Sequence, residues 1–309
     1  VYFIIVFIIA TIIEAIPVTG SYINFLLNSP EYKELVSQYS AGEIDVNGLS
    51  EGVMKVVAAL PESLTILTLF ATALMTATVF VYCRFIEKRK LTTLGFRKKG
   101  FVGEYLVGLV IGAGLFSAAV GINLLTGALT FGGFTQSIAW GTLGLYFVAW
   151  LIQGMAEEVM FRGYFMVSLS RRIPVAIAVL ISSVGFALAH SSNQGVSPLA
   201  YINLTLFGVF AAVYMLKRGN IWGVCAIHSM WNCVQGNLYG VSVSGMSKSE
   251  SIMNMVSVES KSLMNGGAFG LEGGLAVTIV LTLATIIMLC TKTKESELAD
   301  TNAQQVSAV

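Results

Sequence analysis

Residues 141–163 read GTLGLYFVAWLIQGMAEEVMFRG, and this stretch decides the fold class. It is long and apolar enough to cross a bilayer, which takes about 20 such residues. It nevertheless carries Glu157, Glu158 and Arg162 close to its end. Because ionisable side chains are costly inside a membrane, a carboxylate pair there indicates a functional site by default.

The composition of the whole chain is that of a membrane protein. Of 309 residues, 55% are hydrophobic and 11% charged, whereas soluble domains carry roughly 25% charged residues. The mean hydropathy is +0.78. A net charge of +1 gives no support for nucleic-acid binding. We therefore expect the lipid bilayer, and no nucleic acid, among the partners.

Hydropathy predicts an all-α, polytopic membrane helix bundle with about eight transmembrane helices. The predicted spans are 1–28, 61–85, 101–125, 141–165, 174–191, 198–216, 220–239 and 272–291. We expect a single membrane domain over 1–309. Its N-terminal spans fall within 1–139 and its core within 140–240. Two polar breaks, 29–60 and 240–271, are expected as outer loops, and the Ser, Met and Gly content of the second is typical of a mobile loop.

The first span contains a carboxyl group, and the third contains a glycine motif. Glu14 lies in the first span and is expected to face the bundle or the interface, because carboxyl groups avoid lipid. A signal peptide over 1–28 is the alternative for that segment, and the lack of a basic region before the apolar run disfavours it. Gly108 and Gly112 form G-x-x-x-G, which suits close helix contact.

Basic residues predict how the chain is oriented. If eight spans alternate, most lysines and arginines fall on one side, which the positive-inside rule makes cytoplasmic. The integral membrane protein, expected in the cell membrane, would then have both termini in the cytoplasm. The basic side holds Arg84, Lys88, Lys90, Arg97, Lys98, Lys99, Arg171, Arg172, Lys217, Arg218, Lys292 and Lys294, and the other side holds Lys33, Lys55, Lys248 and Lys261.

The chain has only two histidines, and both stand in helix-spaced motifs. Phe186 and His190 form F-x-x-x-H, and His228 and Asn232 form H-x-x-x-N. Counted from the basic turns, Glu157 lies about 21 Å and His190 about 27 Å into the membrane at 1.5 Å per residue. His228 and Asn232 lie about 15 and 21 Å in on the same basis. Three motifs far apart in sequence are therefore predicted to share one depth, in a cavity between the fourth, fifth and seventh spans.

Helical spacing also separates the roles of the acidic residues. Glu158 and Arg162 are at i, i+4, the favourable order for an ion pair, so both are assigned a mainly structural role. Glu157 points about 100° away and is assigned the chemistry. The alternative is that both carboxylates simply pair with Arg162.

The histidine motifs have structural alternatives as well. His228 and Asn232 present two donors on one helix face, and the alternative is an interhelical hydrogen bond. Phe186 is expected to pack against His190 or the substrate path, with an ordinary core position as the alternative.

The set of residue types suits attack of water on a peptide bond. A carboxylate in a low-dielectric site can act as a base near neutral pH. An imidazole opposite it can orient the water, and a His–Asn pair can donate to a forming oxyanion. No Ser or Cys stands in a recognisable nucleophile motif.

Together, the three motifs resemble those of the CAAX-protease and bacteriocin-processing (CPBP, or Abi) family of intramembrane endopeptidases. The resemblance covers about 140–240 and keeps the family order. It implies an eight-helix membrane enzyme that cleaves a peptide or protein substrate in or at the membrane. By resemblance, Glu157 would activate water, His190 would assist, and His228 with Asn232 would form the oxyanion site.

The resemblance leaves two questions open. The family has been described both as metal-dependent and as metal-free. No cofactor is expected, because H-E-x-x-H spacing is absent, although Glu157, His190 and His228 would satisfy zinc on ligand count. The functional alternatives are a non-catalytic immunity or scaffold protein of the same fold, a metal-dependent version of the peptidase, and a proton-coupled transporter, which would need paired repeats that the sequence lacks.

Overall fold

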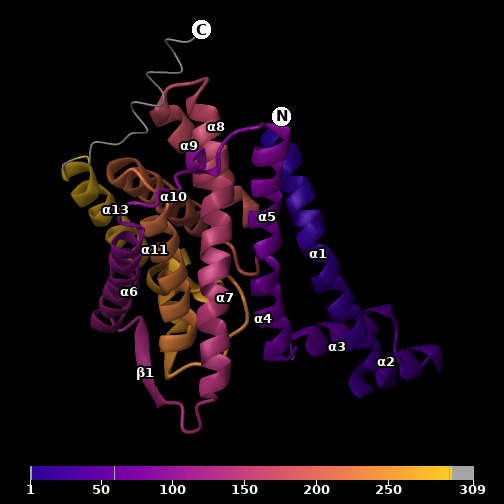
Figure 1. Ribbon diagram of the computed structural model, residues 1–309. Coiled ribbons are helices and arrows are strands. Elements are labelled where there is room, and N and C mark those ends of the chain that lie inside the picture. Colours follow the sequence, from indigo (N-terminus) through magenta and orange to yellow (C-terminus); the bar gives the residue numbers. More distant parts are fainter. Residues whose placement is uncertain (1, 59, 292, 294–309) are drawn as a thin grey trace.

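The computed structural model describes residues 2–58, 60–291 and 293, and this part of the chain is a helix bundle (Figure 1). In chain order the principal helices are α1 (Tyr2–Asn28), α2 (Pro30–Ser40), α3 (Val46–Ala58), α4 (Glu62–Ala71), α5 (Ala73–Val81), α6 (Phe101–Leu125), α7 (Trp140–Glu158), α8 (Val167–Ser170), α9 (Val175–Ala189), α10 (Pro198–Arg218), α11 (Trp222–Cys233), α12 (Ser262–Asn265) and α13 (Leu275–Cys290). The predicted all-α membrane bundle is confirmed.

All eight predicted spans are helical, although they differ in length and apolarity. Within the described residues, four helical stretches are long and apolar enough to cross a membrane: Tyr2–Asn28, Glu62–Ile86, Phe101–Leu125 and Pro198–Arg218. Two shorter apolar helices, α9 and α13, match the fifth and eighth spans. The fourth and seventh spans, which carry the acidic and His–Asn motifs, continue from α7 and α11 into π-helical turns at Val159–Met166 and Val234–Leu238.

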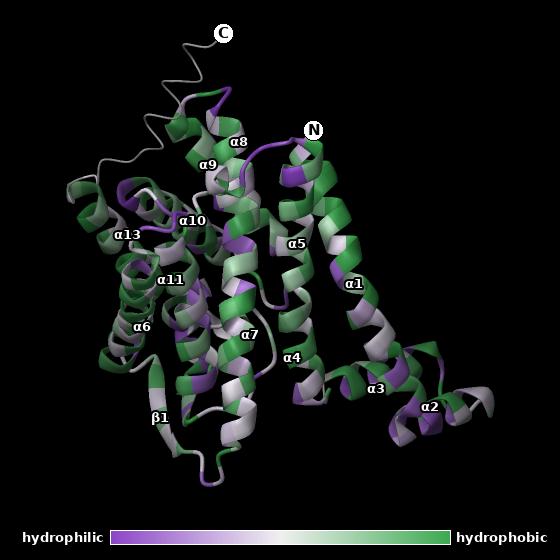
Figure 2. Cartoon of the chain, viewed as in Figure 1, coloured by the Kyte–Doolittle hydropathy of each residue, from purple (hydrophilic) through white to green (hydrophobic). Residues whose placement is uncertain are grey.

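Apolar side chains cover the outside of the bundle. The hydrophobic colour dominates the helices in Figure 2, while hydrophilic residues gather at turns, along α2, and inside the bundle. In α1, only Val6 and Ala10 are buried. Such a surface suits lipid, because the bilayer interior offers nothing for polar groups to bond. The protein is therefore an integral membrane protein.

Contacts between helix ends bring several of the basic connections together. The Arg218 guanidinium, at the end of α10, donates to the Glu104 carboxylate in the first turn of α6 at 2.6 and 2.9 Å. The Lys217 Nζ donates to the carbonyl of Leu289 at the end of α13, at 3.0 Å. The Trp222 Nε1 donates to the carbonyl of Arg97 at 2.9 Å. The basic connections therefore lie together at one end of the bundle; Lys292 and Lys294 fall outside the described residues.

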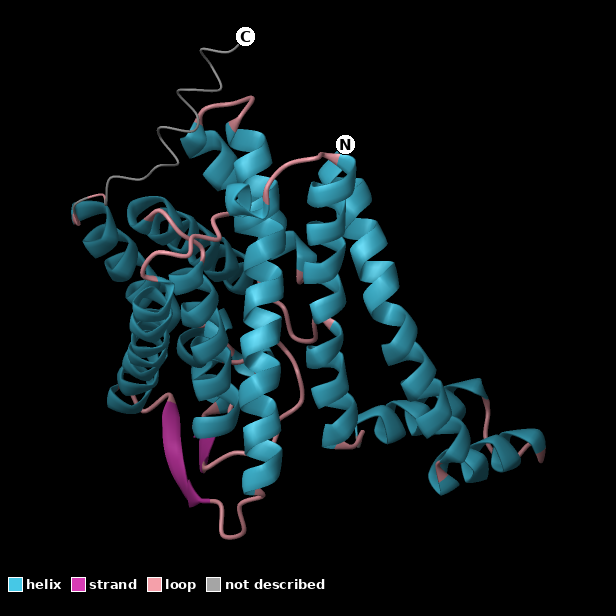
Figure 3. Ribbon diagram, viewed as in Figure 1, coloured by secondary structure: helices cyan, strands magenta, loops and turns pink. Residues whose placement is uncertain are grey.

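Segment 240–271, which was expected as a mobile outer loop, contains regular secondary structure. It contributes β2 (Met253–Ser257), which pairs antiparallel with β1 (Leu129–Phe134), the strand pair in Figure 3. Leu129 stands opposite Ser257, and the register shifts between Phe131 and Phe134. The segment expected as a mobile loop thus includes a strand and short helices packed against the bundle.

Glycines allow the central helices to approach closely. A Cβ at Gly108 or Gly112 of α6 would collide with the backbone carbonyls of Gly223 and Ile227 in α11. The close contact expected from G-x-x-x-G is therefore present. It fixes α11, which carries the His–Asn motif, against the bundle.

Candidate active site

The acidic motif lies where α7 becomes π-helical. Glu158 is fully buried, and its Oε1 accepts a hydrogen bond from Arg162 Nη1 at 2.9 Å. The predicted i, i+4 ion pair is present. Glu157 points elsewhere, and its Oε1 accepts a hydrogen bond from Gln153 Nε2 at 2.7 Å. Short π-helical segments occur often at functional sites, and this one was not anticipated from the sequence.

His228 lies between the two glutamates. Its Nδ1 is 2.8 Å from Glu158 Oε1, and its Nε2 is 3.6 Å from Glu157 Oε2. Since Glu158 already accepts from Arg162, it acts as a carboxylate here and His228 Nδ1 carries the proton. Sequence spacing assigned Glu158 to Arg162 alone, whereas the structure shows that Glu158 also orients the imidazole.

Asn232 reaches Glu157 through a bridging side chain that sequence reasoning missed. Asn232 Nδ2 donates to Gln153 Oε1 at 2.9 Å, and Gln153 in turn donates to Glu157. Gln153 and Asn232 are both buried. The i, i+4 spacing of Gln153 and Glu157 was the available sequence signal. The interhelical hydrogen bond considered as an alternative for Asn232 is therefore real, and it leads into the acidic motif.

Close contact between α7 and α11 makes these distances possible. A Cβ at Gly154 would lie 2.5 Å from Ser229 Oγ and 2.6 Å from the Ser229 backbone nitrogen. Real Cβ atoms are not found that close to other atoms, so the position requires glycine. Gly154 therefore sets the spacing across which the two motifs meet.

Aromatic rings surround the charged cluster. The Arg162 guanidinium carbon lies 4.4 Å from the Phe186 ring centroid, a cation–π distance. Phe186 is 4.8 Å from the His190 ring, and Phe207 is 4.9 Å from the His228 ring. Phe186 is thus a buried core residue that also packs against Arg162 and His190. Both the core position and the contact with His190 that were considered for it are present.

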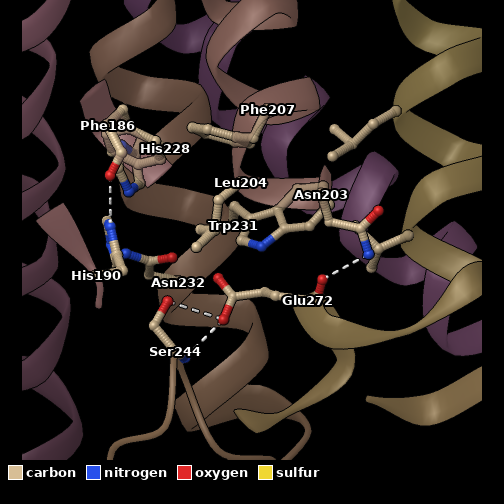
Figure 4. Close-up of a pocket in the computed structure, with 12 residues that line it drawn as sticks. Phe186, His190, Asn203, Leu204, Phe207, His228, Trp231, Asn232, Ser244 and Glu272 are labelled. Atoms are coloured by element: carbon tan, nitrogen blue, oxygen red, sulfur yellow. Dashed lines mark hydrogen bonds between the residues drawn. The ribbon is translucent and has the colours of Figure 1, made fainter. Parts of the chain in front are cut away.

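His190 follows the last residue of α9 and is half-buried. Its Nδ1 lies 2.9 Å from the Phe186 carbonyl oxygen. A carbonyl only accepts, so Nδ1 carries the proton and Nε2 of the neutral ring is an acceptor. Figure 4 shows this bond with the ring beside Asn232. No hydrogen bond joins His190 and Glu157 among the described contacts.

A small cavity adjoins the cluster (Figure 4). Its enclosed volume is about 20 Å³, which is room for about one water molecule. His190, His228 and Asn232 line it. Other walls come from α10 and α13, which the sequence did not place at the site. Glu157 is not among the lining residues and lies beside His228 instead. The prediction that the fourth span helps to enclose the cavity is therefore wrong, whereas the fifth and seventh spans do line it.

Several polar atoms of the cluster lack hydrogen-bond partners among the described residues. Buried Glu157 Oε2, Glu158 Oε2, and Arg162 Nε and Nη2 are in this group. Buried polar atoms are nearly always satisfied in proteins, and exceptions concentrate at functional sites. Glu157 Oε2 is the atom on the His228 side, so it is an available proton acceptor next to the cavity.

The zinc alternative would need the described side chains to converge as a ligand set. Nowhere in the described residues do three or more His, Cys, Asp or Glu side chains gather as a metal ion requires. Two His and one Glu would be the minimum protein set for catalytic zinc. In this geometry Glu157 and His228 are close, while His190 faces the cavity. The residues as placed do not fit a zinc site.

A further carboxylate approaches the cluster from α1. Glu14 is half-buried rather than lipid-facing, and it interacts electrostatically with Glu157. This placement agrees with the expectation that it faces the bundle. Helix α1, which is far from the motifs in sequence, therefore contributes a third carboxyl group near the site.

One family of known proteins is similar to this chain in the region of the site. The model of the family described as "Type II CAAX prenyl endopeptidase Rce1-like" matches residues 139–234. No curated protein and no solved structure matches the chain. The matched segment runs from α7 through α11 and contains all three motifs. Over residues 139–234, the chain is therefore similar to the Rce1-like CAAX endopeptidase family, and this stretch is called the Rce1-like segment below.

Proposed function

We propose that this protein is an intramembrane endopeptidase that hydrolyses a peptide bond with water activated by Glu157. One observation carries the proposal. A carboxylate with an unsatisfied oxygen stands 3.6 Å from an imidazole that a second, buried carboxylate orients. The imidazole lines the cavity together with His190 and Asn232. Because this cluster falls inside the Rce1-like segment, peptide hydrolysis is the reaction that it supports best.

In the proposed first step, Glu157 Oε2 removes a proton from a water bound beside His228, between Glu157 and the cavity, while the water oxygen bonds to the carbonyl carbon of the substrate. His190 Nε2, the free acceptor of that ring, accepts a hydrogen bond from the second hydrogen of the water, which stays on the oxygen, and so orients the water. A tetrahedral intermediate with one negative oxygen forms. A positioned general base contributes about 10²- to 10⁴-fold to such a step.

His228 and Asn232 stabilise the developing negative charge in this proposal. Since His228 Nδ1 donates to Glu158, Nε2 donates to the oxyanion in the doubly protonated form of the ring. Asn232 has a second amide hydrogen besides the one given to Gln153. Loss of one such donor lowers the rate about 10²- to 10³-fold in other enzymes.

The second step breaks the carbon–nitrogen bond. The intermediate re-forms the carbonyl, and the proton held by Glu157 passes to the departing nitrogen, so that an amine and a carboxyl group leave. Glu158 and Arg162 act through His228 and do not touch the substrate. They are positioning residues whose buried ion pair fixes the imidazole.

The experiment is cleavage of peptides by the purified full-length chain in H₂¹⁸O, with products analysed by mass spectrometry. The proposal predicts one ¹⁸O atom in the new carboxyl group, and no cleavage above background by Glu157→Gln. Glu259→Gln, an exposed carboxylate outside the site, serves as the matched control. Cleavage that persists in Glu157→Gln would contradict the mechanism, and an inert wild-type protein would favour the immunity or scaffold alternative.

A further inference from the structure

A buried carboxylate outside the Rce1-like segment also faces the cavity. Glu272 precedes α13, is 7% exposed and lines the cavity. Its Oε2 accepts hydrogen bonds from the Ser244 backbone nitrogen at 2.6 Å and from Ser244 Oγ at 2.9 Å. Figure 4 shows both bonds, with the second carboxylate oxygen directed into the cavity. Ser244 thus anchors one oxygen, the Gln235 side chain also bonds the carboxylate, and the other oxygen is directed into the cavity.

Hydrogen bonds from α10 hold the backbone at Glu272. Asn203 Nδ2 donates to the carbonyl oxygens of Glu272 and Gly274 at 2.7 and 2.9 Å. Asn203 Oδ1 accepts from Thr278 Oγ1 at 2.6 Å. All these groups are buried or half-buried. The carboxylate is therefore placed by a supported framework, as a recognition group must be.

The loop that supplies Ser244 is equally constrained. Its carbonyl accepts a hydrogen bond from Asn193 Nδ2 at 2.8 Å. Gly245 and Gly270 adopt φ of +83° and +102°, and a Cβ at either would collide with a neighbouring carbonyl. Glycine tolerates both the conformation and the contact. The outer segment is thus packed tightly against the turn that bears Glu272.

The charge of this carboxylate is not matched within the cavity. No Lys or Arg is among the described residues that line it, and the other ionisable groups there are His190 and His228. Leu204, Val277 and Leu281 contribute apolar walls. Apolar walls beside a carboxylate suit a cation carried on an aliphatic stem, because the stem packs while the head is bonded. Since the cavity has room for about one water molecule, these walls must move apart to admit such a side chain.

We propose that Glu272 determines specificity by binding a basic side chain of the substrate, Lys or Arg, next to the scissile bond. This inference rests on the proposed function, because the cavity that Glu272 faces is the one lined by His190, His228 and Asn232. A substrate group of negative charge is disfavoured at the same position. The selectivity would then come from Glu272, which lies outside the Rce1-like segment, and the chemistry from residues inside that segment.

The test compares kcat/KM for matched peptides that carry Lys, norleucine or Glu at each position flanking the cleaved bond. The full-length wild-type protein should favour Lys over norleucine at one position by about 10- to 100-fold, the range of a hydrogen bond to a charged partner. In Glu272→Gln that ratio should fall to about one, whereas Glu259→Gln should keep it. Equal cleavage of the Lys and norleucine peptides by wild type, or an unchanged ratio in Glu272→Gln, would overturn the proposal.

A binding measurement separates this proposal from the peptidase itself. Calorimetry with n-butylammonium and the neutral 1-pentanol needs no turnover. The ammonium should bind wild type at least about tenfold more tightly than the alcohol, and Glu272→Gln should lose that difference. Selective binding of the amine without any peptide cleavage would support the Glu272 subsite and overturn the proposed peptidase function. Peptide cleavage without any preference for the charged ligand would support the peptidase function and overturn the Glu272 subsite. If neither cleavage nor selective amine binding is seen, both proposals are overturned.

Discussion

The buried ion pair of Glu158 gives a prediction whose size follows from the structure. Glu158 and Arg162 side chains are both 0% exposed, and Glu158 Oε1 also bonds His228. In Glu158→Gln, Arg162 keeps its charge without a buried counter-ion, a loss that costs about 3–5 kcal/mol in other proteins. We expect the free energy of unfolding to fall by about that amount. The cation–π contact of Arg162 with Phe186 is present in both proteins, so it does not reduce this difference.

Reversible unfolding of the purified protein in mixed micelles measures this change. Glu157→Gln is the control, because its side chain is 19% exposed and accepts from the neutral Gln153. Its loss should be under about 1 kcal/mol, which is the net worth of an ordinary hydrogen bond. The double variant Glu158→Gln with Arg162→Met should be more stable than Glu158→Gln alone, since no unpaired charge remains. A Glu158→Gln variant within 1 kcal/mol of wild type would refute the reasoning.

Three further predictions follow from the packing, the basic ends and the metal question. Gly154→Ala should lower stability by about 1–3 kcal/mol through overpacking against Ser229, whereas Gly144→Ala, with no atom within 4 Å of the added Cβ, should have little effect in the same unfolding assay. A single cysteine at Lys98 should react with an impermeant reagent only after the cells are opened, because the basic end is expected in the cytoplasm; labelling of intact cells would reverse the topology. Active protein should contain no stoichiometric metal and should survive exhaustive chelation, and activity lost on chelation and restored by zinc would point to a metallopeptidase.

Local patterns in the sequence were sufficient to predict the helices and one ion pair. Apolar runs of bilayer length can satisfy their backbone groups only as helices, which made the spans readable. Helical periodicity likewise placed Arg162 one turn from Glu158. Both are properties of neighbouring residues along the chain. The resemblance in the three motifs then located the Rce1-like segment, which the family comparison confirmed.

Local sequence patterns could not predict contacts between distant segments of the chain. Nothing local in the sequence tells that Asn232 bonds Gln153, or that Glu272 turns into the cavity. The pairing of β1 with β2 joins strands more than a hundred residues apart, and a Gly-rich strand of six residues has little β propensity of its own. Depth arithmetic gave the level of each residue in the bundle but not its direction around the helix axis. That is why Glu157 was expected inside the cavity, whereas it approaches the cavity behind His228.

The most direct test of the central claim is the single-turnover rate of Glu157→Gln on a peptide that wild type cleaves. Glu157 is assigned as the base because its Oε2 faces His228 and accepts no hydrogen bond from a described residue. The account predicts a rate lower by about 10²- to 10⁴-fold in a protein whose unfolding is close to that of wild type. A folded Glu157→Gln protein that cleaves within about tenfold of the wild-type rate, well short of that range, would contradict it and remove Glu157 from the chemistry.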